Sequence, residues 1–190
     1  MKGAQSLPHR DRVRRVVLLC CCVAQNVTFY RAAVADPTAS VLSDHHPEAA
    51  FLRRTINNFL DVAVLDWCKL FGSQRSEKHH WRCVVSDVTS FEQALFHELA
   101  TNADMFDALV KKILYYRNTF IAHLDNDLTM NVPELDPALK AVAFYHRYIV
   151  EHEARPDELA GLPTVDAFAR GFAQSSDEAM RAYRKLSNLP

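Results

Sequence analysis

Apolar residues recur every three or four positions along most of the chain, which is the spacing of one face of an α-helix. Strand-like alternation of apolar and polar residues is scarce. The pattern predicts a first helix over residues 10–35, ended by Asp36 and Pro37, and a second helix from Pro47 to Gly72. Proline suits the first turn of a helix and glycine the position after its end, so both boundaries of the second helix are marked.

The middle of the chain begins with a charged connection over residues 73–88. Thr89 and Glu92 have the spacing of a capping box, which predicts a short helix ending near Ala100. Three apolar residues of the connection are expected to reach the core: Trp81, Val84 and Val85.

A further helix is predicted to begin after a cap at Thr101 or Asn102 and to end near Asp125. Residues 125–133 form a loop. Asp136 followed by Pro137 has the pattern of an N-cap and a first-turn proline, so the next helix is expected to begin there and to end near residue 154.

Pro156, Gly161 and Pro163 interrupt the helical pattern. Residues 164–174 and 176–186 are predicted to form a final helical pair, since Ser175 and Glu178 give a second capping box. The sequence therefore predicts an all-α, up-and-down helical bundle of four main helices with short peripheral ones. We expect one domain: a bundle over residues 1–155, with residues 156–190 as a helical appendage packed on it.

Composition excludes several classes of protein. The 190 residues are 49% apolar, and 22 basic side chains nearly balance 23 acidic ones. A general polyanion-binding domain is usually strongly basic, so only a local nucleic-acid site fits this charge. The four glycines are far apart, whereas phosphate-binding loops of nucleotide-binding folds need clustered glycines.

The five cysteines include a run of three, Cys20 to Cys22, and show no C-x-x-C spacing, which favours reduced thiols in the cytoplasm. Arginines followed by the apolar run 16–24 also resemble a secretory signal. The helical spacing continues through Val27, Tyr30 and Val34, which favours a helix of the folded domain. No run reaches the ~20 apolar residues of a membrane span, so we expect a cytoplasmic protein without a membrane partner.

Histidine patterns do not predict a metal site. The pairs His45-His46 and His79-His80 are adjacent in sequence, and adjacent helical side chains point about 100° apart. Neither the H-E-x-x-H pattern of zinc hydrolases nor the Gly-x-Ser-x-Gly pattern of serine hydrolases occurs. We expect no metal and no cofactor.

Arg117 interrupts an apolar stripe on the predicted helix 101–125. On a helical wheel five apolar residues lie within about 40° of it: Phe106, Val110, Ile113, Ile121 and Leu124. Burying an uncompensated guanidinium costs several kcal/mol. Arg117 therefore needs an acidic partner, a polar interface or an anionic ligand. His123 lies about 120° around the wheel and about 9 Å along the axis.

The segment from Tyr116 to Asp125, YRNTFIAHLD, resembles the signature of the HEPN superfamily: an arginine, a polar residue and a histidine late on a long bundle helix. Here the polar residue is Asn118, and five residues separate Arg117 from His123. The surrounding sequence, from Trp67 onward, is similar to the abortive-infection (AbiU-type) branch of that superfamily. The resemblance covers residues 10–155.

The resemblance implies a metal-independent endoribonuclease of prokaryotic toxin or antiphage systems, acting as a homodimer with a composite active site. An antitoxin protein is a further implied partner. In such an enzyme the 2′-hydroxyl of RNA attacks the neighbouring phosphate, His123 transfers the proton, and Arg117 stabilises the added negative charge. Asn118 is expected to orient the histidine or hold a phosphate oxygen.

Five residues are further candidates for RNA contacts: Tyr116, Lys111, Lys112, Arg147 and Tyr148. Exposed lysines steer polyanions, and tyrosines stack on bases. Two alternatives remain open. One is a non-catalytic HEPN-like module for binding or dimerisation; the other is a helical interaction protein in which Arg117 is ion-paired in the core.

Overall fold

The apolar segments form helices in the computed structural model, and no strand occurs among the residues it describes. These residues are 7–35, 47–72, 78–122, 131–155 and 157–163. In the C-terminal segment the described residues are Ala167, Phe168, Arg170, Gly171, Gln174, Ser175, Asp177, Glu178, Arg181, Ala182 and Lys185. The predicted all-α bundle is confirmed.

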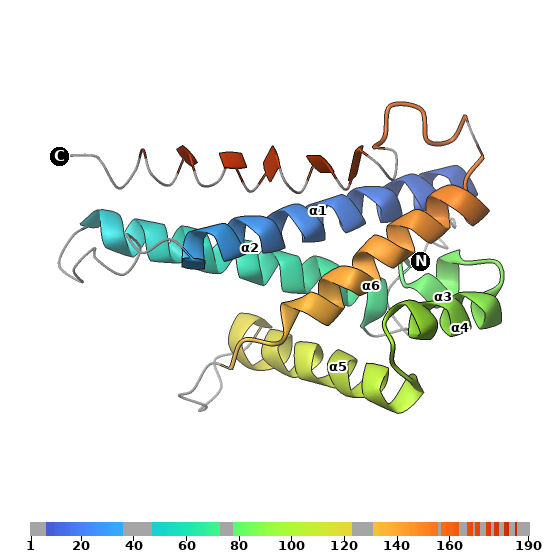
Figure 1. Cartoon of the computed structure of the whole chain (residues 1–190), viewed down its shortest axis with the longest axis horizontal. Coiled ribbons are helices and arrows are strands. Elements are labelled where there is room, and N and C mark those ends of the chain that lie inside the picture. Colours follow the sequence, from blue (N-terminus) through green and yellow to red (C-terminus); the bar gives the residue numbers. More distant parts are fainter. Residues whose placement is uncertain are drawn as a thin grey trace, which may run out of the picture.

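Two long helices, α1 (His9–Ala35) and α2 (Pro47–Phe71), pack side by side, and α6 (Leu135–Tyr148) crosses α1 (Figure 1). The boundaries of α1 and α2 agree with those predicted. The core lies between these helices. Trp67 of α2 is buried there, stacks on Phe71 with ring centroids 5.0 Å apart, and donates its indole N–H to the Ala138 carbonyl of α6 (3.1 Å).

The connection between α2 and α4 contributes to the core as predicted. It contains the short helix α3 (Trp81–Val84), and Trp81, Val84 and Val85 are buried. Helix α4 (Val88–Glu98) begins one residue before Thr89. Its cap is Asp87, whose carboxylate accepts the Ser90 N–H (3.0 Å). The predicted Thr89 cap is wrong because Asp87, two residues earlier, already accepts a free N–H group at the start of the helix, and Thr89 lies inside the first turn.

Helix α5 (Ala103–Tyr116) continues into a π-helical turn, η2 (Arg117–Ala122). Of the two caps considered, Asn102 is the one used: its side-chain oxygen accepts the Met105 N–H (2.9 Å). The predicted helix end near Asp125 and most of the predicted loop lie outside the described residues.

Asn102→Ala is expected to lower the free energy of unfolding by about 1 kcal/mol, because it leaves the Met105 N–H without its side-chain acceptor. Thr101→Ala is the matched control and should change stability by less than half as much. Urea unfolding followed by circular dichroism measures both. An equal loss in the two variants would contradict the assignment of the cap.

Helix α6 begins at Leu135 with Glu134 in the capping position, and the predicted cap, Asp136, lies inside the first turn. Its carboxylate instead accepts a hydrogen bond from Arg31 at the end of α1 (2.6 Å). A carboxylate in the first turn is favourable with respect to the helix dipole, so the position retains its acidic residue without capping. The helix ends in a second π-helical turn, η3 (Ile149–Glu153), close to the predicted end.

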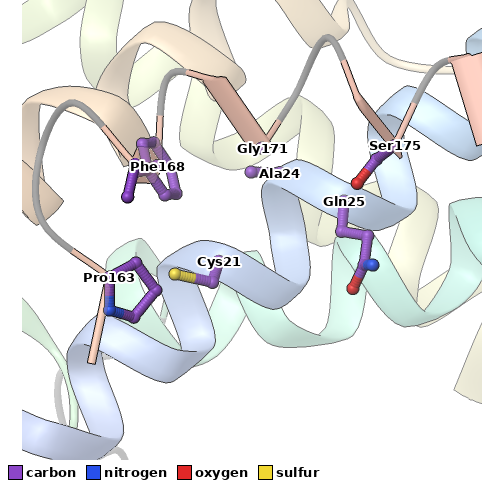
Figure 2. Close-up of a pocket in the computed structure, with 8 residues that line it drawn as sticks. Cys21, Ala24, Gln25, Pro163, Phe168, Gly171 and Ser175 are labelled. Atoms are coloured by element: carbon purple, nitrogen blue, oxygen red, sulfur yellow. The ribbon is translucent and has the colours of Figure 1, made fainter. Parts of the chain in front are cut away.

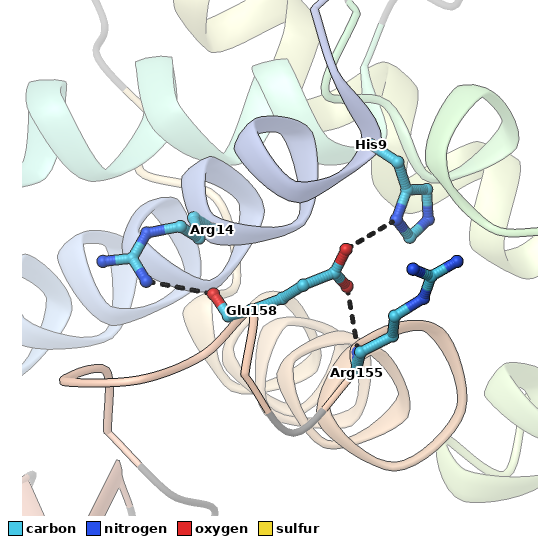
Figure 3. A network of polar contacts seen from close by, with 4 residues as sticks. All are labelled: His9, Arg14, Arg155 and Glu158. Carbon is cyan, nitrogen blue, oxygen red and sulfur yellow. Dashed lines mark hydrogen bonds and ion pairs between the residues drawn. The ribbon is translucent and has the colours of Figure 1, made fainter.

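The predicted break after α6 is present, and residues 157–162 form turns beside the start of α1. Glu158 is 7% exposed and accepts the Arg155 N–H (2.9 Å), while His9 lies 3.8 Å from its other carboxylate oxygen. Arg14 donates to the carbonyl of Glu158 (Figure 3) and to that of Ala160. These contacts join the turn to α1.

The described C-terminal residues are helical and lie along α1 (Figure 1). Phe168, Gly171 and Ser175 line a pocket of about 180 Å³ with Cys21 and Gln25 of α1 (Figure 2). The second predicted capping box is wrong, since Ser175 is itself helical and Glu178 accepts a hydrogen bond from Gln174 (2.9 Å).

Helix α1 is long and apolar enough to cross a membrane, the only such helix in the described part of the chain. A core helix passes the same test. Nine of its residues are buried against the rest of the bundle, from Val13 to Ala33, and its helical spacing extends to Ala35, past the apolar run that resembles a signal. The packing is that of a core helix.

Candidate functional site

Arg117 lies at the junction between α5 and the π-helical turn, and its side chain is half-buried. The residues that α5 buries are Phe106, Ile113 and Tyr116. On a helical wheel their centre lies about 50° from Arg117. The prediction that Arg117 occupies the middle of the buried stripe is therefore wrong: it lies at the edge of that stripe, where a guanidinium retains access to water.

The π-helical turn explains part of the difference between the predicted and the observed position of Arg117 relative to the buried stripe. In a π-helix the hydrogen bonds reach five residues back, so each residue turns less around the axis than in an α-helix. Thr119 would lie opposite Arg117 on an α-helical wheel, yet it is 5% exposed. Helical-wheel angles calculated with α-helical spacing are therefore not valid for the residues after Arg117. Such π-helical turns occur frequently at functional sites.

The Arg117 guanidinium is held by its neighbour. Its Nε and one terminal nitrogen both donate to the Asn118 side-chain oxygen, at 3.0 and 2.8 Å. Asn118 is exposed and carries no charge. Among the described residues no carboxylate is paired with Arg117, so its positive charge is oriented but not neutralised there. This is an arrangement suited to an anionic ligand.

Asp61 of α2 is a neighbour of this site that the sequence analysis did not identify. Tyr116 is 2% exposed and donates its hydroxyl hydrogen to Asp61 (3.3 Å). Burial, followed by the charge of Asp61, raises the pKa of Tyr116, and burial also raises the pKa of Asp61. The sequence signal that could have identified Asp61 is its position as a carboxylate within the apolar run 59–64.

Tyr116 is thereby removed from the candidate RNA-binding residues. A ring that is 2% exposed, and that packs 5.5 Å from the Phe120 ring, has no free face for a base. Its observed role is to fix the end of α5 against α2.

His123, the second candidate catalytic residue, lies one residue beyond η2 and outside the described residues, as does Leu124. The described part of the site therefore consists of Arg117 and Asn118, supported by the contact between Tyr116 and Asp61.

Lys111 and Lys112 are both exposed on α5. Lys112 lines a pocket of about 320 Å³ between the end of α4, α5 and the start of α6, where Met105 and Glu134 also contribute. On the wheel Lys112 lies about 140° from Arg117. The structure thus separates Lys112 from Arg117, while Lys111 and Lys112 remain accessible to a long polyanion.

Arg147 and Tyr148 lie at the far end of α6. Arg147 pairs with Glu98 at the end of α4 (2.8 Å), and the Tyr148 ring packs edge-on against Phe91 (4.9 Å). Helix α6 begins near the end of α5 that carries Arg117 and runs away from it (Figure 1). Arg147 lies twelve positions after Leu135, about 18 Å along the helix. The structure does not bring these two residues together with Arg117.

No group of three or more histidine, cysteine or acidic side chains placed to hold a metal ion occurs among the described residues. Comparison with protein-family models, with curated proteins and with solved structures finds no match to this chain.

Proposed function

We propose that the chain is a metal-independent endoribonuclease of the HEPN type, with Arg117, Asn118 and His123 as catalytic residues. We further propose that it acts as a cytoplasmic homodimer in a prokaryotic toxin or antiphage defence system, with RNA as substrate and an antitoxin protein as a regulating partner. The proposal joins the resemblance of the segment from Tyr116 to Asp125 with the geometry around Arg117.

The observation that carries the proposal is the state of the Arg117 side chain. It is half-buried and oriented by the neutral Asn118 amide through two hydrogen bonds. A structural core arginine is instead expected to be sealed against a carboxylate. This difference favours an anion-binding role over the alternative of a helical protein with an ion-paired core arginine.

The proposed chemistry needs no protein nucleophile. The 2′-hydroxyl of RNA attacks the adjacent phosphorus, and the bond from phosphorus to the 5′-oxygen of the next nucleotide breaks. His123 accepts the hydroxyl proton and returns a proton to the leaving 5′-oxygen, so that one proton passes from the nucleophile to the leaving group. Arg117 stabilises the additional negative charge on the phosphate oxygens, and Asn118 keeps the guanidinium in place. Exposed Lys111 and Lys112 attract the RNA backbone.

RNA cleavage by the purified chain is expected to persist in EDTA and to give products ending in 2′,3′-cyclic phosphate. DNA of the same sequence, which lacks the 2′-hydroxyl, should remain intact. Gel analysis of labelled oligonucleotides and mass spectrometry of the product ends measure these outcomes. Loss of cleavage in EDTA that is restored by a divalent ion would contradict the mechanism, and RNA binding without cleavage would favour a non-catalytic module.

A further inference from the structure

Helix α2 is apolar on two opposite faces. Its inner face, with the buried Leu60 and Trp67, packs on α1 and α5. Its outer face carries Phe51, Val62 and Leu65, which are 67%, 42% and 37% exposed. These three residues lie within an arc of about 60° on a helical wheel, opposite Leu60 and Trp67. A helix that is apolar on both sides is expected to be covered on both.

The outer arc has the spacing of a coiled-coil seam. Thr55 and Asn58 lie between the apolar residues, so that positions 51, 55, 58, 62 and 65 are separated alternately by four and three residues. This heptad spacing keeps one stripe facing a second helix over its whole length. A polar residue such as Asn58 within a seam is a known determinant of register and of the number of chains.

The charges beside the seam complement those of a second copy running in the opposite direction. Arg54 and Asp61 lie on the same side of the outer face and flank the midpoint between Thr55 and Asn58. An antiparallel pair centred on that midpoint places Phe51 against Val62 of the partner subunit. It also places Arg54 near Asp61 of the partner subunit.

A parallel pair does not have this complementarity. In a parallel coiled coil a residue beside the seam meets the residue five positions further along the other chain. Asp61 would then face Asp66 of the partner subunit, a carboxylate that already pairs with Lys69 of its own chain (2.7 Å), so that no complementary pair would form. The charges therefore select a second copy in the antiparallel direction.

The seam lies next to the candidate site. Asp61 accepts the hydrogen bond from Tyr116, and Arg117 is the next residue in the chain. Arg54 of the partner subunit, paired with Asp61, therefore adds a second guanidinium beside the turn that carries Arg117. Helix α5 buries Phe106, Ile113 and Tyr116 in its own chain. Its exposed apolar residues, Met105 and Tyr115, lie ten positions and about 80° apart on a helical wheel and form no comparable heptad stripe.

We propose that the outer face of α2 is a homodimer interface in which two copies of α2 pack antiparallel, so that each subunit contributes Arg54 to the surroundings of the other subunit's Arg117. The contribution of Arg54 to a catalytic site rests on the proposed function, whereas the dimer interface itself does not depend on it. The seam over residues 51–65 is about 21 Å long, a short interface that should dissociate at micromolar concentrations.

Light scattering of the full chain, at concentrations well above the expected micromolar dissociation constant, tests the interface without RNA. The wild type is expected to be a dimer and Val62→Lys a monomer, because Val62 packs against Phe51 of the partner subunit and a buried ammonium group opposes that contact. Val34→Lys is the matched control, since Val34 is 58% exposed on α1, and it should remain a dimer. A monomeric wild type, or a dimer unaffected by Val62→Lys, would overturn the proposal.

Arg54→Glu tests the direction of the helices and does not alter the apolar seam. In the antiparallel pair it faces Asp61 of the partner subunit and should raise the dimer dissociation constant about tenfold or more. Arg53→Glu makes the same charge change on an exposed residue about 100° around the helix and should leave the constant nearly unchanged. Equal constants for the two variants would overturn the antiparallel arrangement. If both tests give the expected results but the dimer cleaves no RNA, the interface stands and only the proposed function is contradicted.

Discussion

Arg117→Ala is expected to reduce the rate of RNA cleavage by about 100-fold or more while leaving the fold intact. Removing one group that stabilises developing negative charge typically has an effect of this size. The side chain is half-buried and its observed hydrogen bonds go to exposed Asn118, so its loss opens no cavity in the core. Single-turnover cleavage of a labelled RNA measures the rate, and circular dichroism measures the fold.

The control for this experiment is Arg82→Ala. Arg82 is also partly exposed and pairs with Glu92 at the start of α4 (2.6 Å), away from Arg117 in the chain and in the fold. It should retain cleavage within about threefold of the wild type, since surface ion pairs contribute little. Equal rates for Arg117→Ala and the wild type would show that this guanidinium does not act on the phosphate.

The second large expected effect is a loss of folding stability at acidic pH. His80 and His146 are 4% and 0% exposed, and burial lowers the pKa of each to about 4. In the unfolded chain each has a pKa near 6.5. The unfolded state therefore takes up protons as the pH falls through 6.5, whereas the folded state stays neutral until about pH 4. The contribution of these two histidines to the free energy of unfolding should be fully present above pH 6.5 and should decrease between pH 6.5 and 4.

At about pH 5 the expected loss is about 2 kcal/mol for each histidine relative to pH 7. Urea unfolding at the two pH values measures it. His146 is the better residue to replace, since neither ring nitrogen has a hydrogen-bond partner among the described residues and its ring stacks on Phe168 at 4.2 Å. His146→Leu should remove about half of the pH dependence. An unchanged dependence would contradict the assigned ionisation.

The helices and their order could be predicted from the sequence because apolar periodicity, proline and glycine are strong local signals. Pro47 and Gly72 marked both ends of α2 correctly. The N-terminal caps of the helices were harder to predict, since several polar residues near the start of a helix can accept hydrogen bonds from the same free N–H groups. Asp87 and not Thr89 caps α4, and Asp136 pairs with Arg31 instead of capping α6.

The candidate site could be predicted only in part. The motif identified Arg117 and Asn118, which the structure brings into direct contact. A wheel with fixed α-helical spacing placed Arg117 in the middle of the buried stripe, because the change to π-helical geometry at that residue leaves no clear signature in the sequence. Asp61 was missed because its contact with Tyr116 joins residues 55 positions apart.

The most direct test of the proposed ribonuclease is a comparison of the wild-type chain with His123→Ala on the same RNA in EDTA. Both proteins are purified identically, and RNA integrity and product ends are measured over the same time. The account predicts cleavage to 2′,3′-cyclic phosphate ends by the wild type and intact RNA with His123→Ala. Intact RNA with both proteins, or equal cleavage by both, would contradict it.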